Sequence, residues 1–324
     1  MLQTVNRQLE KWMPIITPIS VIIGVMLAEN LLPLTFLIPW LFAFMTFSGS
    51  LNSTFTSLTG ALKKPLPLFI ILLLLHIIMP LLAWTIGHAF FVNDHLTMTG
   101  LVLASVIPTG ITSFIWVTIY NGNIGLALSI ILFDTMLSPF LVPFTLSFLV
   151  GQKIQINTMD IMYGLLFMVV IPSILGMFTN LMTKGKSVKA GKTLAPFSKI
   201  SLACVVMMNG AVISPYLKQF SLKLVIIAIT VFILASFGYF LAWMLSILLK
   251  RDRETKVVMM FTGGMRNISA GAVIAVQYFP AAVAVPVVLG MLFQQVLASI
   301  FGLLFNLFDH KQKQQIEETI PVSQ

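Results

Sequence analysis

Apolar stretches of about 20 residues recur along the chain and are separated by short polar or charged segments. A helix rises about 1.5 Å per residue, so each stretch is long enough to cross a hydrocarbon core of about 30 Å. The pattern therefore predicts an all-α polytopic membrane protein with ten transmembrane helices. These spans are expected at residues 12–32, 35–51, 65–91, 97–120, 123–150, 158–183, 195–217, 222–249, 256–279 and 281–308.

The composition agrees with this interpretation. Of the 324 residues, 58% are hydrophobic and 9% are charged, whereas a soluble domain carries about 25% charged residues. The net charge of +9 does not indicate a nucleic-acid partner, because the basic residues lie between the spans. The expected partner is the lipid bilayer. A single cysteine, Cys204, excludes a disulfide framework within the chain.

The basic residues are distributed unevenly between the two sides of the predicted membrane. Ten spans place both termini on one side, and 15 of the 19 lysines and arginines fall on that side. Three fall on the other side, and Arg266 lies within a span. Lysine and arginine favour the cytoplasmic side, so both termini are expected in the cytoplasm.

The two halves of the chain carry similar interruptions. Gly24 and Gly176 lie 152 residues apart, and Gly110 and Gly263 lie 153 apart. This nearly constant offset predicts two repeats of five helices, and an odd number of spans requires that the repeats be inverted in the membrane. The expected divisions are the first repeat with helix 6 at 1–183, a flexible cytoplasmic linker at 184–194, helices 7–10 at 195–308 and a disordered cytoplasmic tail at 309–324.

The fourth and ninth spans are interrupted near their centres. Residues 108–110, Pro-Thr-Gly, fall inside the span 97–120, and the glycine pair 263–264 precedes Arg266 in the span 256–279. Broken helices with polar residues at the break form the midplane binding sites of many secondary transporters. The breaks therefore predict a transporter site at the interface of the two repeats.

Three ionisable side chains lie near the predicted midplane. His76, Asp134 and Arg266 are each about 10–12 residues into spans that start in the cytoplasm, at a depth of about 15–18 Å. Because a lone charge is costly there, Asp134 and Arg266 are expected to pair, directly or through a substrate. The pair is either a structural salt bridge or a site for substrate or proton. His76 either bonds carbonyls that Pro80 frees or transfers a proton.

Hydroxyl and amide side chains surround both breaks. The half-helix N-termini at the breaks present N–H groups, which attract anions. Amides midway along the last span act either as links between helices or as substrate contacts. With Arg266, the candidate substrate-binding residues are Thr109, Gly110, Thr112, Ser113, Asn267, Ser269, Gln294 and Gln295.

The sequence offers no set of residues typical of an enzyme. It has no spaced cluster of histidines, cysteines and carboxylates for a metal, no glycine-rich phosphate loop, and no nucleophile next to a base. We therefore expect no catalytic residues, no metal site and no cofactor.

Several motifs together resemble one known family. Spans 4 and 5 contain PTGITSF at 108–114, NGNIGLALS at 121–129 and LSPFLVP at 137–143, and spans 9 and 10 contain GMRN at 264–267 and AAVAVP at 281–286. These segments resemble the bile acid:sodium symporter family, and the similarity extends over essentially the whole chain. The resemblance implies a bacterial cytoplasmic (inner) membrane protein with ten helices, of which helices 4 and 9 are broken and cross. It also implies a core of helices 3–5 and 8–10 that moves against a panel of helices 1, 2, 6 and 7.

The chain departs from this family at the sodium ligands. Sodium-coupled members use a Ser-Asn pair in span 4, hydroxyls in span 5, and an acidic residue and a glutamine in span 9. At the matching positions this chain has Ser113, Phe114, Ala127, Ile131, Thr262 and Arg266. Asp134 shares a helix face with Ala127 and Ile131. We interpret Arg266 as a fixed cation in place of sodium, with Asp134 as its counter-charge.

The sequence thus predicts a secondary transporter of a small organic anion, working by alternating access as a monomer or weak dimer. Uniport or proton coupling fits the residues at these positions better than two-sodium symport does. The family resemblance nevertheless leaves coupling to sodium open. Two alternatives remain. One is an auxin-efflux-type carrier, which shares the broken helices, and the other is a transporter-like sensor that binds without translocating.

Overall fold

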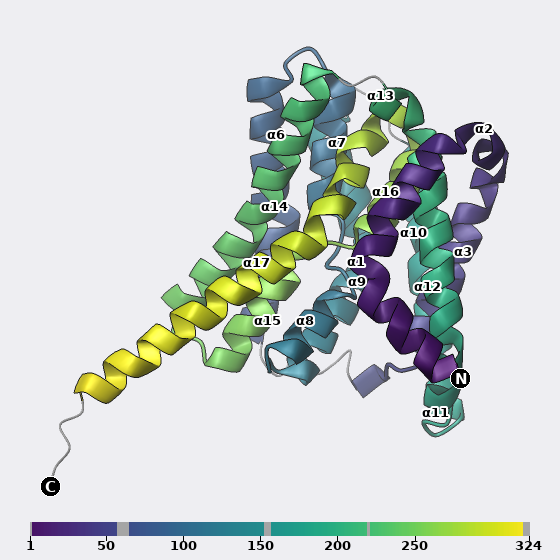
Figure 1. Cartoon of the computed structure of the whole chain (residues 1–324). Helices are drawn as coiled ribbons and strands as arrows, with labels where there is room; N and C mark the ends of the chain where they lie inside the picture. Colours follow the sequence, from purple (N-terminus) through teal and green to yellow (C-terminus); the bar gives the residue numbers. More distant parts are fainter. Residues whose placement is uncertain (1, 57–64, 152–156, 219–220, 320–324) are drawn as a thin grey trace, which may run out of the picture.

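A computed structural model describes residues 2–56, 65–151, 157–218 and 221–319, and nearly all of them are helical (Figure 1). Two short stretches, η3 and η4, are π-helical turns and η1 is a 3₁₀ turn. In chain order the elements are α1 (Leu2–Met26), α2 (Ala28–Leu31), η1 (Leu32–Leu37), α3 (Ile38–Ser50), α5 (Pro65–Leu73), η3 (Leu74–Ile78), α6 (Met79–Phe90), α7 (His95–Val106), α8 (Ser113–Ile119), α9 (Ile124–Val150), α10 (Thr158–Leu165), η4 (Leu166–Val170), α11 (Ile171–Met182), α12 (Ser187–Val212), α13 (Ser214–Lys218), α14 (Leu222–Leu248), α15 (Arg253–Gly264), α16 (Ile268–Tyr278) and α17 (Ala281–Thr319).

The helices have the length and apolarity of a multi-pass membrane protein. Within the described ranges, seven helical stretches are long and apolar enough to cross a bilayer. They are Ala28–Ser50, Pro65–Phe90, Ile124–Val150, Thr158–Met182, Ser187–Val212, Leu222–Leu248 and Ala281–Asp309. The shorter apolar helices Ile15–Met26, His95–Val106 and Ile268–Tyr278 fall in the predicted spans 1, 4 and 9.

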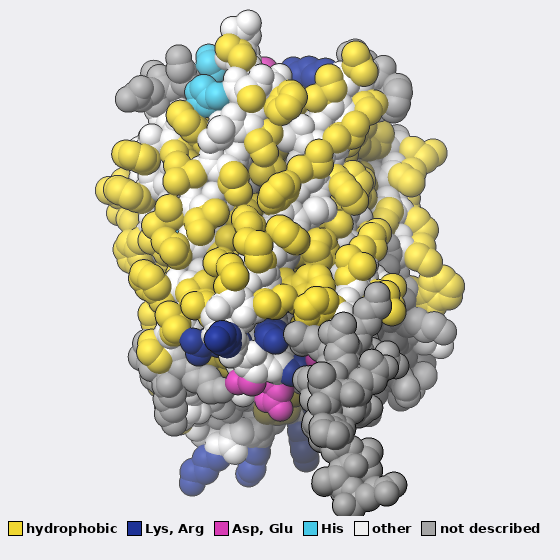
Figure 2. All heavy atoms as spheres, turned by 90° about the vertical axis from the view of Figure 1, so that its left-hand side faces the viewer, with side chains coloured by type: hydrophobic (Ala, Val, Ile, Leu, Met, Phe, Trp, Pro, Cys, Tyr) yellow, Lys and Arg dark blue, Asp and Glu magenta, His cyan; other side chains and the backbone are white. Residues whose placement is uncertain are grey.

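The outer surface is apolar where a bilayer would contact it. In Figure 2, hydrophobic side chains cover the middle of the face shown, and the charged side chains are confined to its two ends. On α9, Phe140, Phe144 and Phe148 are 59%, 69% and 75% exposed. Their spacing of four residues places them on one side of the helix, which therefore faces lipid.

The helices pack in two groups. On the right of Figure 1, α12 packs against α1 and α3, and α3 packs against α11. In the other group, α7 packs against α6, α9 and α17, while α14 packs against α15 and α17. The groups meet where α12 contacts α16 and α17, where α1 contacts α17 and where α3 contacts α16. The broken helices belong to the second group.

Two predicted connections are more ordered than expected. The cytoplasmic linker expected at 184–194 is mostly helix, because α12 already begins at Ser187. Only a tight turn precedes it, with Lys184 at φ 50° and Gly185 at φ 83°. The tail expected from residue 309 continues α17 to Thr319. Its lysines, glutamines and glutamates are good helix formers, so no signal ends the helix at residue 309.

Candidate functional site

The two broken helices cross, and their breaks pair through the backbone. The first break lies between α7 and α8, and the second lies between α15 and α16. Thr109 and Arg266 form an isolated antiparallel bridge. The N–H of Gly110 donates to Met265 O over 3.1 Å, and the N–H of Asn267 donates to Pro108 O over 2.8 Å. Each break therefore satisfies backbone groups that the other leaves free, as a bilayer interior requires.

Glycine is required at position 110 of this crossing. A Cβ placed on Gly110 would lie 2.6 Å from the carbonyl oxygen of Arg266, closer than side chains tolerate. The glycine pair before Arg266 has a different role from the one predicted. Gly263 and Gly264 are the last residues of α15, and a Cβ on Gly264 would lie 2.3 Å from the ring of Tyr239. This pair allows α15 to pack closely on α14, and the break follows it.

Thr109 makes three hydrogen bonds at the crossing. Its side chain is fully buried, and its hydroxyl donates to Thr262 O over 2.6 Å and to Met265 O over 3.1 Å. Its backbone N–H donates to Oδ2 of Asp134 over 2.6 Å. Thr109 therefore joins the second break to a buried carboxylate on α9.

Asp134 pairs with His76. Its Oδ1 lies 2.5 Å from Nε2 of His76, and the residues are 0% and 6% exposed. His76 was expected to bond carbonyls freed by Pro80 or to transfer a proton; the structure joins its Nε2 to a carboxylate and not to a carbonyl, and proton transfer stays a prediction. Pro80 lacks the N–H that would bond the His76 carbonyl, and the helix forms the π turn η3 around His76. Nδ1 of His76 is buried and has no hydrogen-bond partner among the described residues.

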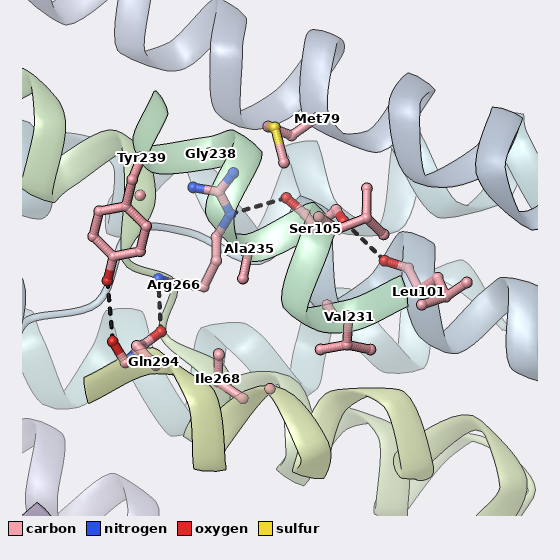
Figure 3. A pocket seen from close by; sticks show the side chains of 14 residues that line it. Met79, Leu101, Ser105, Val231, Ala235, Gly238, Tyr239, Arg266, Ile268 and Gln294 are labelled. Atoms are coloured by element: carbon pink, nitrogen blue, oxygen red, sulfur yellow. Dashed lines mark hydrogen bonds between the residues drawn. The ribbon is translucent and has the colours of Figure 1, made fainter. Parts of the chain in front are cut away.

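The Arg266 guanidinium binds backbone carbonyls. Its Nε donates to Ser105 O over 3.1 Å (Figure 3). Its Nη1 donates to Gly263 O over 2.9 Å, and the residue is 6% exposed. Ser105 and Gly263 lie in the last turns of α7 and α15, where helix dipoles place partial negative charge. The predicted direct pair with Asp134 is wrong, because among the described residues these two side chains form no ion pair.

A small cavity adjoins Arg266. It has a volume of about 40 Å³, which admits a few water molecules and not an organic anion. Its walls come mainly from α7, α14 and α17, and apolar side chains dominate them (Figure 3). The lining residues are Met79, Leu101, Ala104, Ser105, Val231, Leu234, Ala235, Gly238, Tyr239, Gly264, Arg266, Ile268, Gly290 and Gln294.

The two glutamines of α17 contact the crossing. Oε1 of Gln294 accepts the backbone N–H of Arg266 over 3.0 Å. Oε1 of Gln295 accepts from Nε1 of Trp116 on α8, also over 3.0 Å. Both therefore link helices, which was one of the two roles considered for them. Their side chains are partly exposed, so a solute contact is compatible with this geometry.

The other predicted substrate contacts differ in accessibility. Thr112, Asn267 and Ser269 are partly exposed, whereas Thr109, Gly110 and Ser113 are buried. Asn267 also caps α16, because its Oδ1 accepts the N–H of Ala270 over 3.3 Å. The partly exposed Thr112, Asn267 and Ser269 thus lie on the C-terminal side of the breaks or in the second break itself, whereas the buried Thr109 and Gly110 hold the two breaks together.

The positions that match sodium ligands offer few oxygens. Ala127 and Ile131 are buried and apolar, and Phe114 is partly exposed. The Thr262 hydroxyl donates to Val258 O of its own helix. Oγ of Ser113 is buried and has no partner in the described part of the chain. The described residues also contain no group of three histidines, cysteines or carboxylates that could hold a metal.

Sequence reasoning did not identify Ser105, Tyr239 or Asn209. Ser105 acts through its carbonyl, which leaves no mark in a sequence. Tyr239 is buried beside Arg266 and its hydroxyl donates to Gln294 O over 3.2 Å. Asn209 on α12 is 0% exposed, and neither atom of its amide has a partner among the described residues. A lone amide in the apolar span 195–217 is a signal that could have identified it.

Comparisons with known proteins support the resemblance. A family model described as "Sodium Bile acid symporter family" matches residues 39–220 of the chain. The chain is 52% identical over 300 residues to "Uncharacterized protein YbaS" of Bacillus subtilis (strain 168), covering 92% of this chain and 98% of that protein. It is 24% identical over 224 residues to "Uncharacterized sodium-dependent transporter YocS" of the same organism, covering 69% and 68%. It is 27% identical over 265 residues to "Probable sodium/metabolite cotransporter BASS1, chloroplastic" of Arabidopsis thaliana, covering 80% and 64%.

Proposed function

Since the chain belongs to the sodium bile acid symporter family, we propose that it is a secondary active transporter that moves a small organic anion by alternating access. The observation that carries this proposal is the backbone pairing of two broken helices at Thr109 and Arg266. Discontinuous helices in secondary transporters bring helix ends and free backbone groups to the substrate and to its coupling ion.

In this proposal the chain crosses the membrane ten times as two inverted five-helix repeats. The seven long spans are joined by α1, by α7 with α8 and by α15 with α16. The distribution of lysine and arginine favours cytoplasmic termini in a bacterial cytoplasmic (inner) membrane. Similar breaks in the two halves then cross at the repeat interface.

The two packing groups are the proposed moving parts. The panel consists of α1, α3, α11 and α12, with α10 continuing into α11, and the core contains the two broken helices. The groups meet where α12 contacts α16 and where α10 contacts α9. Rocking of the core against the panel would open these contacts first to one side of the membrane and then to the other.

The substrate carboxylate is proposed to bind at the partly exposed side of the crossing. Thr112, Asn267, Ser269 and Gln295 supply accessible polar atoms there. Arg266 is buried behind them and supplies positive charge to the site without direct contact. The cavity beside Arg266 is too small for this substrate, so in this proposal the binding site forms between core and panel when the two move apart.

Coupling to two sodium ions is not proposed, although YocS is described as sodium-dependent and BASS1 as a probable sodium/metabolite cotransporter. Sodium requires several hard oxygen ligands, and Ala127 and Ile131 offer none. The Arg266 guanidinium already satisfies the carbonyls of Ser105 and Gly263 at two half-helix ends. It acts as a permanently bound cation at this position.

Uptake into proteoliposomes tests this function. The purified protein is reconstituted and offered radiolabelled acetate, lactate, succinate and, as a bulky anion, taurocholate. We expect saturable uptake of one of the small anions, absent from protein-free liposomes. Binding without uptake would favour a sensor, and uptake of taurocholate alone would contradict a small substrate.

Two matched variants test the location of the site. Asn267 and Asn123 both cap helices through Oδ1, but only Asn267 lies at the crossing. Asn267→Asp and Asn123→Asp each keep a cap acceptor and add a negative charge. Asn267→Asp should weaken anion uptake by repulsion, and Asn123→Asp should not. Equal effects would argue against a carboxylate site at the crossing.

A further inference from the structure

The buried pair of His76 and Asp134 has an arrangement that a structural contact does not require. Both oxygens of the Asp134 carboxylate are engaged, Oδ2 by the N–H of Thr109 and Oδ1 by Nε2 of His76. The Thr109 N–H can only donate, so Oδ2 is an acceptor. A carboxylate accepting on both oxygens holds His76 with its proton on Nε2.

The remaining ring nitrogen of His76 is then a free base. Nδ1 carries the lone pair of the neutral imidazole, and it is buried without a partner among the described residues. A histidine that only stabilised the fold would be expected to use both nitrogens, because buried polar atoms are nearly always bonded. This nitrogen is the one place in the cluster where a proton can be added without breaking a bond.

The surrounding charges fit the uptake of one proton. Arg266, in the segment between α15 and α16, interacts electrostatically with Asp134, and Tyr239 of α14 lies beside Arg266. The elements packed on η3, which are α5, α6, α7 and α9, bring no other titratable side chain to the pair, because His88 and His95 lie at helix ends. With neutral His76 the cluster carries no net charge. One proton gives it +1, which balances a monovalent organic anion.

We propose that His76 and Asp134 form a proton-binding site that couples proton and organic anion movement in the same direction. The proton adds to Nδ1 of His76, and the imidazolium stays bound to the Asp134 carboxylate. In the packing seen here the new N–H has no acceptor, so protonation favours the alternate packing of the core. The bond from Thr109 to Asp134 transmits this preference to the crossing. The proton leaves on the other side after the anion is released.

The inference rests on the proposed carrier function, and a measurement without any organic anion separates the two. Proteoliposomes of the full chain are adsorbed on a solid-supported membrane and exposed to a pH jump from about 8 to about 6. We expect a transient charge displacement from the wild-type protein. Asp94→Asn is the control, because Asp94 pairs with Lys223 outside the cluster.

Two variants identify the proton acceptor. His76→Gln can still donate an N–H to Asp134 but has no titratable nitrogen, so it should fold and lose the charge displacement. Asp134→Asn should reduce the displacement, because the imidazolium loses the counter-charge that holds it in the buried site. If Asp134→Asn does not fold, His76→Gln alone decides. An unchanged displacement in folded His76→Gln would overturn the proposal.

Transport in a pH gradient completes the test. With the small anion that the wild-type protein takes up, an inwardly directed proton gradient should raise uptake, and His76→Gln should abolish that stimulation. Saturable uptake with no response to pH overturns the proton site and leaves the carrier function standing. A charge displacement without uptake of any anion supports the proton site and contradicts the carrier.

Discussion

The backbone N–H of Thr109 donates to the Asp134 carboxylate over 2.6 Å. Through this bond the break between α7 and α8 is held to α9, and through His76 the same carboxylate is held to η3. Asp134 therefore ties three separate segments of the first half of the chain to the point where the broken helices cross. The consequences of changing it follow from this position.

Asp134→Asn should destabilise the protein. An amide has one acceptor oxygen, so it cannot accept from both Thr109 and His76. Either one of these bonds is lost or His76 must move its proton to Nδ1, which has no partner among the described residues. Leaving a buried charge network incomplete typically costs about 3 kcal/mol or more. We expect a lower thermal unfolding midpoint in detergent. Asp160→Asn, at the exposed start of α10, is the control and should change little. Equal midpoints for the two variants would contradict the role given to Asp134.

A double-mutant cycle tests how Asp134 and Arg266 interact. They make no ion pair, but both are buried and carry opposite charges. We expect Asp134→Asn and Arg266→Gln to show a coupling of about 1 kcal/mol, at the lower end for residues that share a network. Full recovery of stability in the double variant would indicate a direct pair. Strict additivity would show that the two charges act independently.

Substitutions of His76 separate its hydrogen bond from its titration. His76→Gln keeps an N–H donor for Asp134, whereas His76→Leu leaves one carboxylate oxygen without a partner. The leucine variant should lose about 1–3 kcal/mol more stability than the glutamine variant. Thermal unfolding of both in detergent checks this order. If leucine is tolerated as well as glutamine, the contact between His76 and Asp134 is not important for folding.

Gly110→Ala should disrupt the crossing. The added methyl would lie 2.6 Å from the Arg266 carbonyl oxygen, which is fixed by the paired backbones. Gly49→Ala on α3 is a matched control, because its methyl would meet nothing closer than 3.7 Å. We expect Gly110→Ala to lose folded protein and Gly49→Ala to keep or slightly gain stability. Size-exclusion profiles of the two purified variants compare them directly.

The positions of the breaks could be predicted from the sequence because their causes are local. Pro108 and Gly110 interrupt a helix by their own chemistry, and the apolar pattern sets the lengths of the spans. The role of Gly263 and Gly264 could not be predicted, because it depends on how the preceding helix α14 packs its Tyr239 and Ala242 against them. Glycine serves both for close helix packing and for breaking a helix, so its presence in a sequence does not tell the two roles apart.

The arrangement of the charged residues was only partly predictable. Counting residues along a helix gives the depth of Asp134 and Arg266, but not the direction in which a long side chain extends. Arg266 reaches the carbonyls of Ser105 and Gly263, and carbonyls are present at every position of a sequence. The π turn at η3 also changes the helix phase near His76. The contact between Asp134 and His76 can therefore be identified only from the three-dimensional structure.

The interpretation of Arg266 as a fixed cation makes the sharpest prediction. Wild-type uptake and stability should not change when Na⁺ replaces K⁺ or choline, because the guanidinium already occupies the ends of α7 and α15. Arg266→Gln removes that charge and leaves the Ser105 and Gly263 carbonyls, with an amide oxygen beside them, as hard oxygen ligands. These are the groups with which half-helix ends bind sodium in other secondary transporters.

Arg266→Gln should therefore become responsive to sodium. Its thermal unfolding midpoint should rise with NaCl and not with choline chloride at equal ionic strength, since a ligand that binds only the folded state stabilises it. Arg266→Lys retains a positive charge and should stay unresponsive, although one ammonium group cannot reproduce the planar fork that bonds both carbonyls. A sodium-dependent midpoint in the wild-type protein would show that the guanidinium does not replace the ion. An Arg266→Gln variant that folds and ignores sodium would show that the vacated position is not a cation site.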